Sequence, residues 1–267
     1  MQDRPVVAPE NPQAILAADE PPPVAVHNAL GGSPFLLLGD HAGRRIPRVL
    51  GDLGLSAEDA ERHIAWDIGI AGLGVALADR LGATFIHQRY SRLVIDCNRR
   101  PGAIDSIPAV SDGTAIAANV ALDEADAAAR VAAIHRPYQA AIATEIERRA
   151  GSGQATILIS LHSFTPVMRG VPRPWQVGVL HDAGDARFAV ALLAALGEEG
   201  DLTVGDNEPY SMDVIDYTIP HHAYPRRLPY AEIEVRQDLL CDESGVAEWC
   251  ERLERALLRA VKAVCPA

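Results

Sequence analysis

The stretch ATILISLHSF, residues 155–164, is largely apolar. Its apolar residues predict a buried strand over 156–162. The strand ends in His162, which is followed by Ser163 and Phe164. An imidazole at the end of a core strand is either an ordinary histidine bonded to a backbone carbonyl or a functional group. The rest of the sequence has to decide between the two.

Short apolar runs alternate with helical patterns on both sides of this stretch. The runs predict further strands at 34–40, 83–88, 92–97, 175–181 and within 230–240. Apolar residues at helical spacing predict helices at 66–82, 123–153, 184–200 and 244–264, and Pro137 should kink or divide the second of these. Such alternation predicts an α/β fold: a single domain with a mostly parallel (mixed) central sheet and helices on both faces.

The N-terminal segment differs from the rest of the chain. Pro5, Pro9, Pro12 and the proline run 21–23 leave little room for a helix or a central strand. We therefore expect a Pro-rich N-terminal arm over 1–32, either loose or laid over the domain. The folded domain should occupy 33–267, because no internal repeat and no second linker interrupts it.

The composition excludes several classes of protein. A net charge of −12 and a pI near 5.1 argue against nucleic acid or an anionic membrane as a partner, although local arginines can still bind a small anion. The cysteines form no CxxC pair, which indicates reduced thiols. The sequence has no long apolar span and no export signal, so we expect a soluble, cytoplasmic protein. Its oligomeric state is not determined by the sequence.

Two histidines follow predicted strands and suggest a metal site. His41 comes directly after the strand 34–40, as His162 ends the strand 156–162. Each alone is more simply a loop or core histidine, but ligands of such sheets bind beyond the carboxyl ends of the strands, where both histidines would meet. Two imidazoles with a carboxylate are a usual zinc ligand set. Asp67 in HIAWDIG is the first candidate for the carboxylate, although it could instead cap a helix, and Asp40 is the next.

Charged residues also surround two other predicted strands. Arg92, Asn98, Arg99 and Arg100 bracket the run in YSRLVIDCNRRP. Surface arginines are usually solvated, but a guanidinium suits a carboxylate and can stabilise an oxyanion.

A carboxylate lies within the apolar strand YAEIEVRQDLL. There Glu234 shares a face with Glu232, and a buried carboxylate needs a partner. That partner is either Arg236 in an ion pair or a metal-bound water that needs a base.

Taken together, these stretches resemble the N-formylglutamate amidohydrolase family, zinc-dependent hydrolases related to the aspartoacylase and carboxypeptidase-like group. The resemblance is carried by DHAGRRIP, HIAWDIG, SRLVIDCNRRP, LISLHSFTP, VGDNEPYS and LPYAEIEVRQDLL, in this order from about residue 35 to 240. It implies a phosphorylase/hydrolase-like zinc-hydrolase architecture, with 33–267 as the catalytic domain.

The resemblance also implies roles for individual residues. His41 and His162 are similar to the two histidine ligands of one Zn²⁺ ion per chain. The wider group has a second ligand in H-x-x-E, but here Arg44 occupies that position, so Asp67 is expected as the third ligand. Glu234 is similar to the general base, and Arg92 to the arginine that faces the oxyanion.

The expected substrate-binding residues come from the same resemblance. Asn98 and Arg99 would hold the substrate carboxylate, and Arg100 or Arg44 would take a second one. The residues expected to line the pocket as well are Asn207, Tyr210, Ser211 and His222.

The implied reaction is hydrolysis of the amide of a small anionic N-acyl amino acid. The resemblance suggests N-formyl-L-glutamate, cleaved to formate and L-glutamate in histidine degradation. A first alternative is another N-acyl amino acid or a peptide amide, with the Pro-rich arm and the loop 165–175 reshaping the pocket. A second is a non-catalytic binder of small carboxylates, which the missing H-x-x-E carboxylate motivates.

Overall fold

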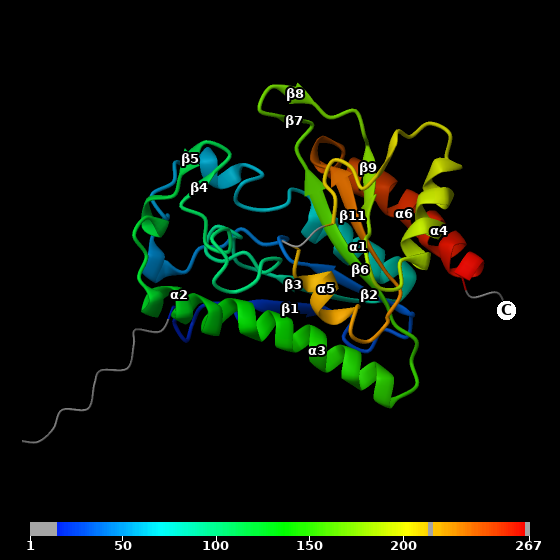
Figure 1. Cartoon of the computed structure of the whole chain (residues 1–267), viewed down its shortest axis with the longest axis horizontal. Coiled ribbons are helices and arrows are strands. Elements are labelled where there is room, and N and C mark those ends of the chain that lie inside the picture. The colour runs from blue at the N-terminus through cyan, green and yellow to red at the C-terminus, as the bar shows by residue number, and fades with distance from the viewer. Residues whose placement is uncertain (1–14, 213–215, 265–267) are drawn as a thin grey trace, which may run out of the picture.

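A computed structural model describes residues 15–212 and 216–264. Its centre is a seven-stranded sheet in the order β1-β3-β2-β6-β11-β9-β10 (Figure 1). The sheet is parallel from β3 to β11 and between β9 and β10, whereas β1 and β3, and β11 and β9, pair antiparallel. The predicted mixed, mostly parallel sheet is thus confirmed. Its strands are β1 Val24–His27, β3 Thr84–Gln88, β2 Phe35–Gly39, β6 Ile157–Phe164, β11 Tyr230–Arg236, β9 Val177–Leu180 and β10 Val204–Asp206.

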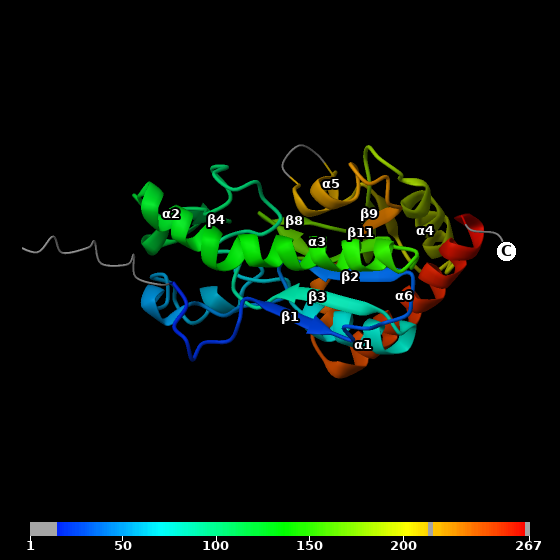
Figure 2. The same cartoon turned by 90° about the horizontal axis from the view of Figure 1, so that it is seen from below.

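Helices cover both faces of this sheet, as Figure 2 shows. On one face, α1, α4 and α6 pack their apolar residues against the sheet, and on the other face α3 and α5 do so. None of the described helices is long and apolar enough to cross a membrane. The helices are α1 Ile70–Leu81, α2 Glu124–Arg130, α3 Arg136–Gly151, α4 Arg187–Gly197, α5 Thr218–His222 and α6 Glu243–Val264.

Short elements complete the structure. Two hairpins project from the loops, β4 Val110–Ser111 with β5 Thr114–Ala115, and β7 Val167–Met168 with β8 Val171–Pro172. The remaining short helices are η1 Arg48–Leu50, η2 Asp59–Glu61, η3 Ala117–Asn119, η4 Val131–His135 and η5 Gln237–Leu240.

The strand β6 differs between its two faces. Ile159 and Leu161 point into the core under α1, α4 and α6, because side chains alternate along a strand. Ser160 and His162 therefore point to the opposite face. The register of β11 places Glu232 beside Ser160 and Glu234 beside His162 on that same face. Polar side chains thus gather there toward the carboxyl ends of β6 and β11.

The prediction of a strand at 92–97 is wrong. This segment runs through turns, although Leu93, Val94 and Cys97 are fully buried. Its carbonyl groups accept hydrogen bonds from side chains instead of from a neighbouring strand, for example Val94 O from Arg130 Nη1 at 3.0 Å and Cys97 O from Gln139 Nε2 at 2.8 Å. Side chains therefore satisfy the backbone hydrogen-bonding groups of this buried, irregular segment. Its apolar content alone does not distinguish it from a strand.

Two other predictions are refined by the structure. The helix predicted at 123–153 consists of α2, a π-helical segment at 131–135 and α3, which follow one another without a break, and Pro137 lies just after the π-helical segment. In the Pro-rich segment 1–32, residues Val24–His27 form the edge strand β1, so part of the expected arm belongs to the sheet.

Candidate functional site

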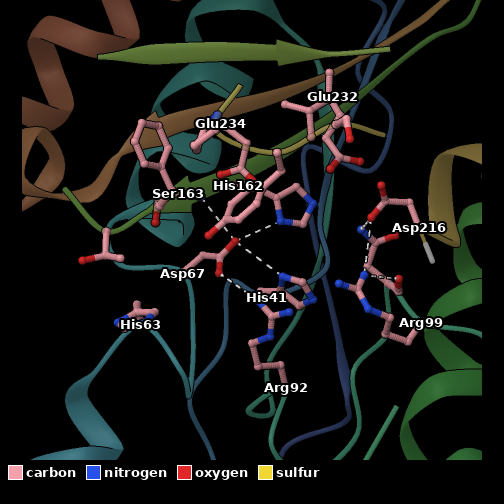
Figure 3. A pocket seen from close by; sticks show the side chains of 17 residues that line it. His41, His63, Asp67, Arg92, Arg99, His162, Ser163, Asp216, Glu232 and Glu234 are labelled. Atoms are coloured by element: carbon pink, nitrogen blue, oxygen red, sulfur yellow. Dashed lines mark hydrogen bonds and ion pairs between the residues drawn. The ribbon is translucent and has the colours of Figure 1, made fainter. Parts of the chain in front are cut away.

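A cavity of about 450 Å³ lies beyond the polar face of β6 and β11 (Figure 3). The site residues predicted from the sequence that line it are His41, Asp67, Arg92, Asn98, Arg99, His162, Tyr210, Ser211 and Glu234. These residues are widely separated in the sequence. Most of them lie in β6 and β11 or follow β2 and β3, and these four parallel strands end at one edge of the sheet. Tyr210 and Ser211 instead follow β10, which runs in the opposite direction.

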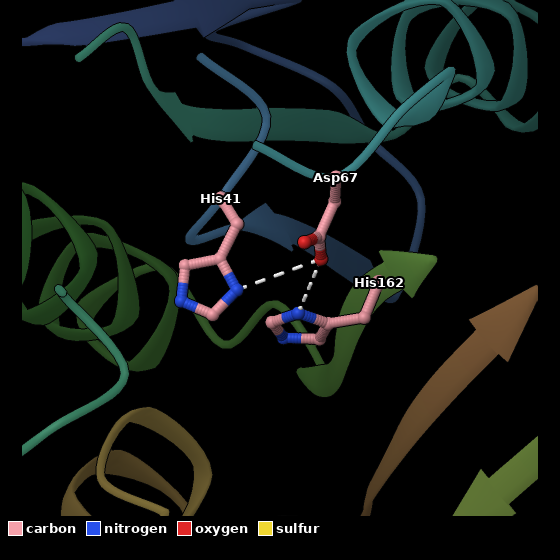
Figure 4. Close-up of side chains that lie close together, drawn as sticks. All are labelled: His41, Asp67 and His162. Atoms are coloured by element: carbon pink, nitrogen blue, oxygen red, sulfur yellow. Dashed lines mark hydrogen bonds and ion pairs between the residues drawn. The ribbon is translucent and has the colours of Figure 1, made fainter. Parts of the chain in front are cut away.

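The centre of the cavity holds a buried cluster of His41, Asp67 and His162 (Figure 4). One ligand-type atom from each of the three lies within 4.8 Å of the others. Asp67 Oδ2 is 3.5 Å from Nδ1 of His41 and 2.9 Å from Nδ1 of His162. Asp67 lies in the turn before α1, and its side chain points to the histidines and does not cap the helix.

The surroundings of His41 determine which of its nitrogens is free. Its Nε2 donates a 2.7 Å hydrogen bond to Asp96 Oδ1, because a carboxylate can only accept. The neutral ring therefore has its lone pair on Nδ1, which faces Asp67 and is buried without a hydrogen-bond partner. Such an orphaned lone pair beside a carboxylate is suited to a cation.

His162 is oriented by a similar chain of hydrogen bonds. Its Nε2 lies 3.0 Å from Ser160 Oγ, and that hydroxyl donates to Asp40 Oδ2 at 3.0 Å. Ser160 thus accepts from Nε2–H, which leaves Nδ1 of His162 facing Asp67 Oδ2. Two acceptors at this separation need a proton or a cation between them. Asp40, the second candidate for the carboxylate ligand, instead supports His162 from behind.

The electrostatics of the cluster also favour positive charge. Burial lowers the pKa of His162, but the charges of Glu232, Asp40 and Asp67 outweigh it and raise that pKa well above the usual value. Burial likewise raises the pKa of Asp67, but the neighbouring imidazoles outweigh it and lower that pKa. Two imidazoles and one carboxylate fit the ligand set of a catalytic zinc site, so His41, Asp67 and His162 could hold a divalent cation.

Glu234 reaches the same cavity from the neighbouring strand. Its Oε2 is buried without a hydrogen-bond partner, and so is Oε2 of Glu232 two residues earlier. Burial raises the pKa of Glu234 to about 7 and raises that of Glu232 well above its ordinary value. A carboxyl group that titrates near neutrality can both accept and return a proton.

Arg92 joins the cluster through Asp96. Its Nε and Nη2 donate to Asp96 Oδ2 at 3.1 and 2.7 Å, while Oδ1 of the same carboxylate holds His41. Nη1 of Arg92 lies 3.6 Å from Asp67 Oδ1, on the cavity side. A guanidinium is thus fixed beside the cluster, where it can stabilise developing negative charge.

Arg99 and Asp216 lie together on another side of the cavity (Figure 3), and Asn98, which also lines the cavity, bonds the same aspartate. Asn98 Nδ2 donates to Asp216 Oδ1 at 3.2 Å, and Arg99 Nη1 lies 3.4 Å from the same oxygen. Arg99 Nε donates to Asp105 Oδ2 at 2.8 Å. The two predicted carboxylate-binding residues already hold a carboxylate of the protein itself.

A sequence profile of the N-formylglutamate amidohydrolase family matches residues 33–241, more than half of the chain. The chain belongs to this family. Membership supports amide hydrolysis as its reaction. No curated protein matched the chain by sequence.

Two solved structures resemble this family member over nearly its whole length. A gene product of Agrobacterium tumefaciens has a TM-score of 0.91 at 36% sequence identity, over 94% of this chain and 99% of that one. The N-formylglutamate amidohydrolase of Ralstonia eutropha JMP134 has a TM-score of 0.64 at 22% identity, over 91% and 98%. The second similarity supports the shared fold.

Several residues predicted for the site lie elsewhere in the amidohydrolase fold. Arg100, Asn207 and His222 are not among the described residues that line the cavity. His222 is buried under α3, where its Nε2 bonds Gln139 Oε1 at 2.7 Å, and Asn207 Oδ1 accepts from the backbone of His181 at 2.9 Å.

The two arginines expected at a second carboxylate are also elsewhere. Arg100 is exposed. Arg44 is about half exposed, pairs with Glu61 and lies over the ring of Trp66. Their expected role in binding a second carboxylate is therefore not supported.

Sequence reasoning missed two residues that shape the site, Asp96 and Asp216. Asp96 lies in the arginine-rich stretch singled out above, as a buried acid within an apolar run, and that pattern could have revealed it. Asp216 follows no pattern that distinguishes it from a surface aspartate.

A close backbone contact fixes the segment after His41 against the segment before Arg92. A Cβ at Gly43 would lie 2.1 Å from the carbonyl carbon of Arg89. The contact is closed by hydrogen bonds from Arg45 N to Arg89 O at 3.1 Å and from Ser91 N to Arg45 O at 2.8 Å. Only glycine allows this approach.

Proposed function

We propose that this protein is a metal-dependent amidohydrolase that cleaves N-formyl-L-glutamate to formate and L-glutamate, with Zn²⁺ held by His41, Asp67 and His162. The observation that carries the proposal is the buried carboxyl group of Glu234, whose Oε2 has no hydrogen-bond partner, in the same cavity as this cluster. A buried base without a hydrogen-bond partner does not stabilise the fold. Beside three metal-type ligands, however, it can transfer protons during a reaction.

Glu234 acts as the general base and then as the general acid. It takes a proton from the attacking water and returns it to the leaving amine. The register that sets Glu234 beside His162 keeps the carboxylate near the cluster, and its raised pKa lets it perform both transfers near neutral pH.

The negative charge of the tetrahedral intermediate is met by Arg92. This guanidinium is held rigidly by Asp96, so it need not reorganise during the reaction. A bound divalent cation would add Lewis acidity and lower the pKa of water in the cavity. Asn98 and Arg99 bind the α-carboxylate of the substrate, which takes the place of Asp216 as their partner.

The test is release of formate from N-formyl-L-glutamate by zinc-loaded protein, with a chelator-treated sample alongside. We expect rapid release, loss of release on chelation, and recovery when Zn²⁺ is added back. Binding of zinc itself is measured separately by titration of the metal-free protein.

Three outcomes would change the proposal. Release that survives chelation removes the metal from the mechanism. Absence of release, with turnover of another N-acyl amino acid, replaces the substrate. Binding of small carboxylates without turnover of any of them makes the protein a binder instead of an enzyme.

A further inference from the structure

Among the described residues, the lining of the cavity offers no guanidinium group that is free for a second carboxylate of the substrate. Its lining has the carboxylates of Asp67, Asp216, Glu232 and Glu234 but the guanidinium groups of Arg92 and Arg99 alone among the described arginines. Both guanidinium groups already have carboxylate partners. A dianionic substrate such as an N-acyl glutamate therefore needs positive charge from just outside this lining.

Arg173, directly after the hairpin β7–β8, supplies such a charge. Its guanidinium carbon lies 4.7 Å from the ring centroid of Tyr210 and 5.8 Å from that of Phe164, and both rings line the cavity. Its Nη1 donates to the hydroxyl of Tyr210 at 2.8 Å. None of the ion pairs found among the described residues includes Arg173.

This arrangement leaves the guanidinium ready to bind. Cation–π contacts with the two rings do not use hydrogen bonds, so they leave the N–H donors of the guanidinium for other partners. One of the five donors is used by Tyr210, and the others are available for a carboxylate. The aromatic contacts also fix the orientation of Arg173, which reduces the entropy lost on binding.

We propose that Arg173 is the residue that binds the side-chain carboxylate of the substrate, so that this enzyme selects N-acyl amino acids with an acidic side chain. The inference rests on the proposed function, since it concerns the substrate of the same cavity.

The position of Arg173 suits a substrate that spans the cluster. Arg99 and Asp216 lie on one side of the His41–Asp67–His162 cluster in Figure 3, and Ser163 lies on the other. The chain continues from Ser163 directly into Phe164, on which Arg173 packs. An N-acyl glutamate bound with its α-carboxylate at Arg99 can thus direct its side-chain carboxylate toward Arg173, while the amide, attached to the same Cα, faces the cluster.

The experiment compares two substrates that differ in charge but not in shape, N-formyl-L-glutamate and N-formyl-L-glutamine. In Arg173→Met, kcat/KM for the glutamate substrate should fall about 10- to 100-fold, as expected for loss of a charged hydrogen bond. The value for the glutamine substrate should change less than about 2-fold, because its neutral amide gains little from the guanidinium. Arg173→Lys should recover part of the preference.

The matched control is Arg169→Met. Arg169 lies on the same hairpin, is largely exposed and only approaches Asp112, at 4.0 Å. Its loss should leave both substrates unchanged. An equal fall for both substrates in Arg173→Met, or an unchanged value for N-formyl-L-glutamate, would overturn the inference.

Binding measurements separate this inference from the proposed function. Calorimetry on Glu234→Gln, with and without Arg173→Met, gives the affinity for both compounds in the absence of turnover. Tighter binding of N-formyl-L-glutamate that disappears with Arg173 supports the inference even when the wild-type protein releases no formate. Formate release combined with equal affinities for the two compounds sustains the function and refutes the role of Arg173.

Discussion

The two faces of the strands β6 and β11 contrast in chemistry although they share one backbone. One face contributes Ile159, Leu161 and Ile233 to the apolar core under α1, α4 and α6. The other contributes His162 and Glu234 to the cavity. Successive residues of the same strand therefore perform different tasks, because their side chains point to opposite sides of the sheet.

The two faces also differ in their contributions to the free energy of folding. Burial of an aliphatic side chain contributes about 1.5 to 3 kcal/mol to stability. A buried carboxylate without a partner, such as Glu234, reduces stability instead. The apolar face thus stabilises a rigid sheet, on which the polar face can keep unpaired groups ready for a ligand.

The largest expected effect tests the polar face. Glu234→Gln should lower kcat for amide hydrolysis by about 10²- to 10⁴-fold, since the amide can neither accept nor return the proton. The melting temperature should stay the same or rise, because the substitution removes a buried unpaired carboxylate. Steady-state kinetics measures kcat, and thermal unfolding measures the melting temperature. A large fall in the melting temperature together with the loss of activity would show that Glu234 stabilises the fold.

The next effect tests the apolar face. Ile159→Ala should reduce the free energy of unfolding by about 2 to 5 kcal/mol, because Ile159 is fully buried among the residues under the helices. The kcat per folded molecule should remain close to the wild-type value. Denaturant unfolding measures the free energy of unfolding, and active-site titration gives the fraction of folded molecules from which kcat is calculated. The milder Ile159→Val serves as control, with a loss of about 0.5 to 1.5 kcal/mol.

A smaller effect is expected from the residue that supports the metal cluster. Asp96→Asn should weaken zinc affinity by about 10- to 100-fold, because the carboxylate that fixes the tautomer of His41 is replaced by an amide. Competition with a chromophoric chelator measures the affinity. Unchanged zinc affinity would show that the orientation of His41 does not depend on Asp96. The polar face would then not need supporting residues to keep its ligands in place.

The last prediction concerns pH. The pKa of Glu234 is raised from 4.5 to about 7 by burial, so the folded protein binds this proton more tightly than the unfolded chain. Its contribution to stability is present below pH 4.5 and lost as the pH rises through about 7. Across this window, metal-free wild-type protein should lose about 3 kcal/mol more than Glu234→Gln. Equal pH profiles of unfolding for the two proteins would contradict the raised pKa.

The sequence predicted the architecture because alternation of short apolar runs with long amphipathic patterns is a strong signal. It also predicted the metal-type cluster, since His41 and His162 both follow apolar strands of a parallel sheet. Asp67 was proposed as the carboxylate that completes a site with two histidines, since Arg44 occupies the position of the second ligand in H-x-x-E.

The rest could not be predicted, for physical reasons that differ between residues. The segment 92–97 has the composition of a strand but is held by side-chain hydrogen bonds from distant helices. His222 and Asn207 were expected in the cavity, but the direction of a side chain in a short helix or a turn depends on tertiary packing. Arg173 was within a loop noted from the sequence, yet its stacking on Phe164 and Tyr210 depends on residues far apart in the chain.

The close contact at Gly43 has a consequence for how this enzyme can change during evolution or design. Any side chain there would separate the segments that carry His41 and Arg92. The relative position of these two residues therefore depends on glycine at this position. The hairpin β7–β8 bears no such constraint, because Val167, Arg169 and Val171 are exposed. New substrate ranges should therefore arise by variation in the hairpin beside Arg173, while the reaction itself is inherited unchanged.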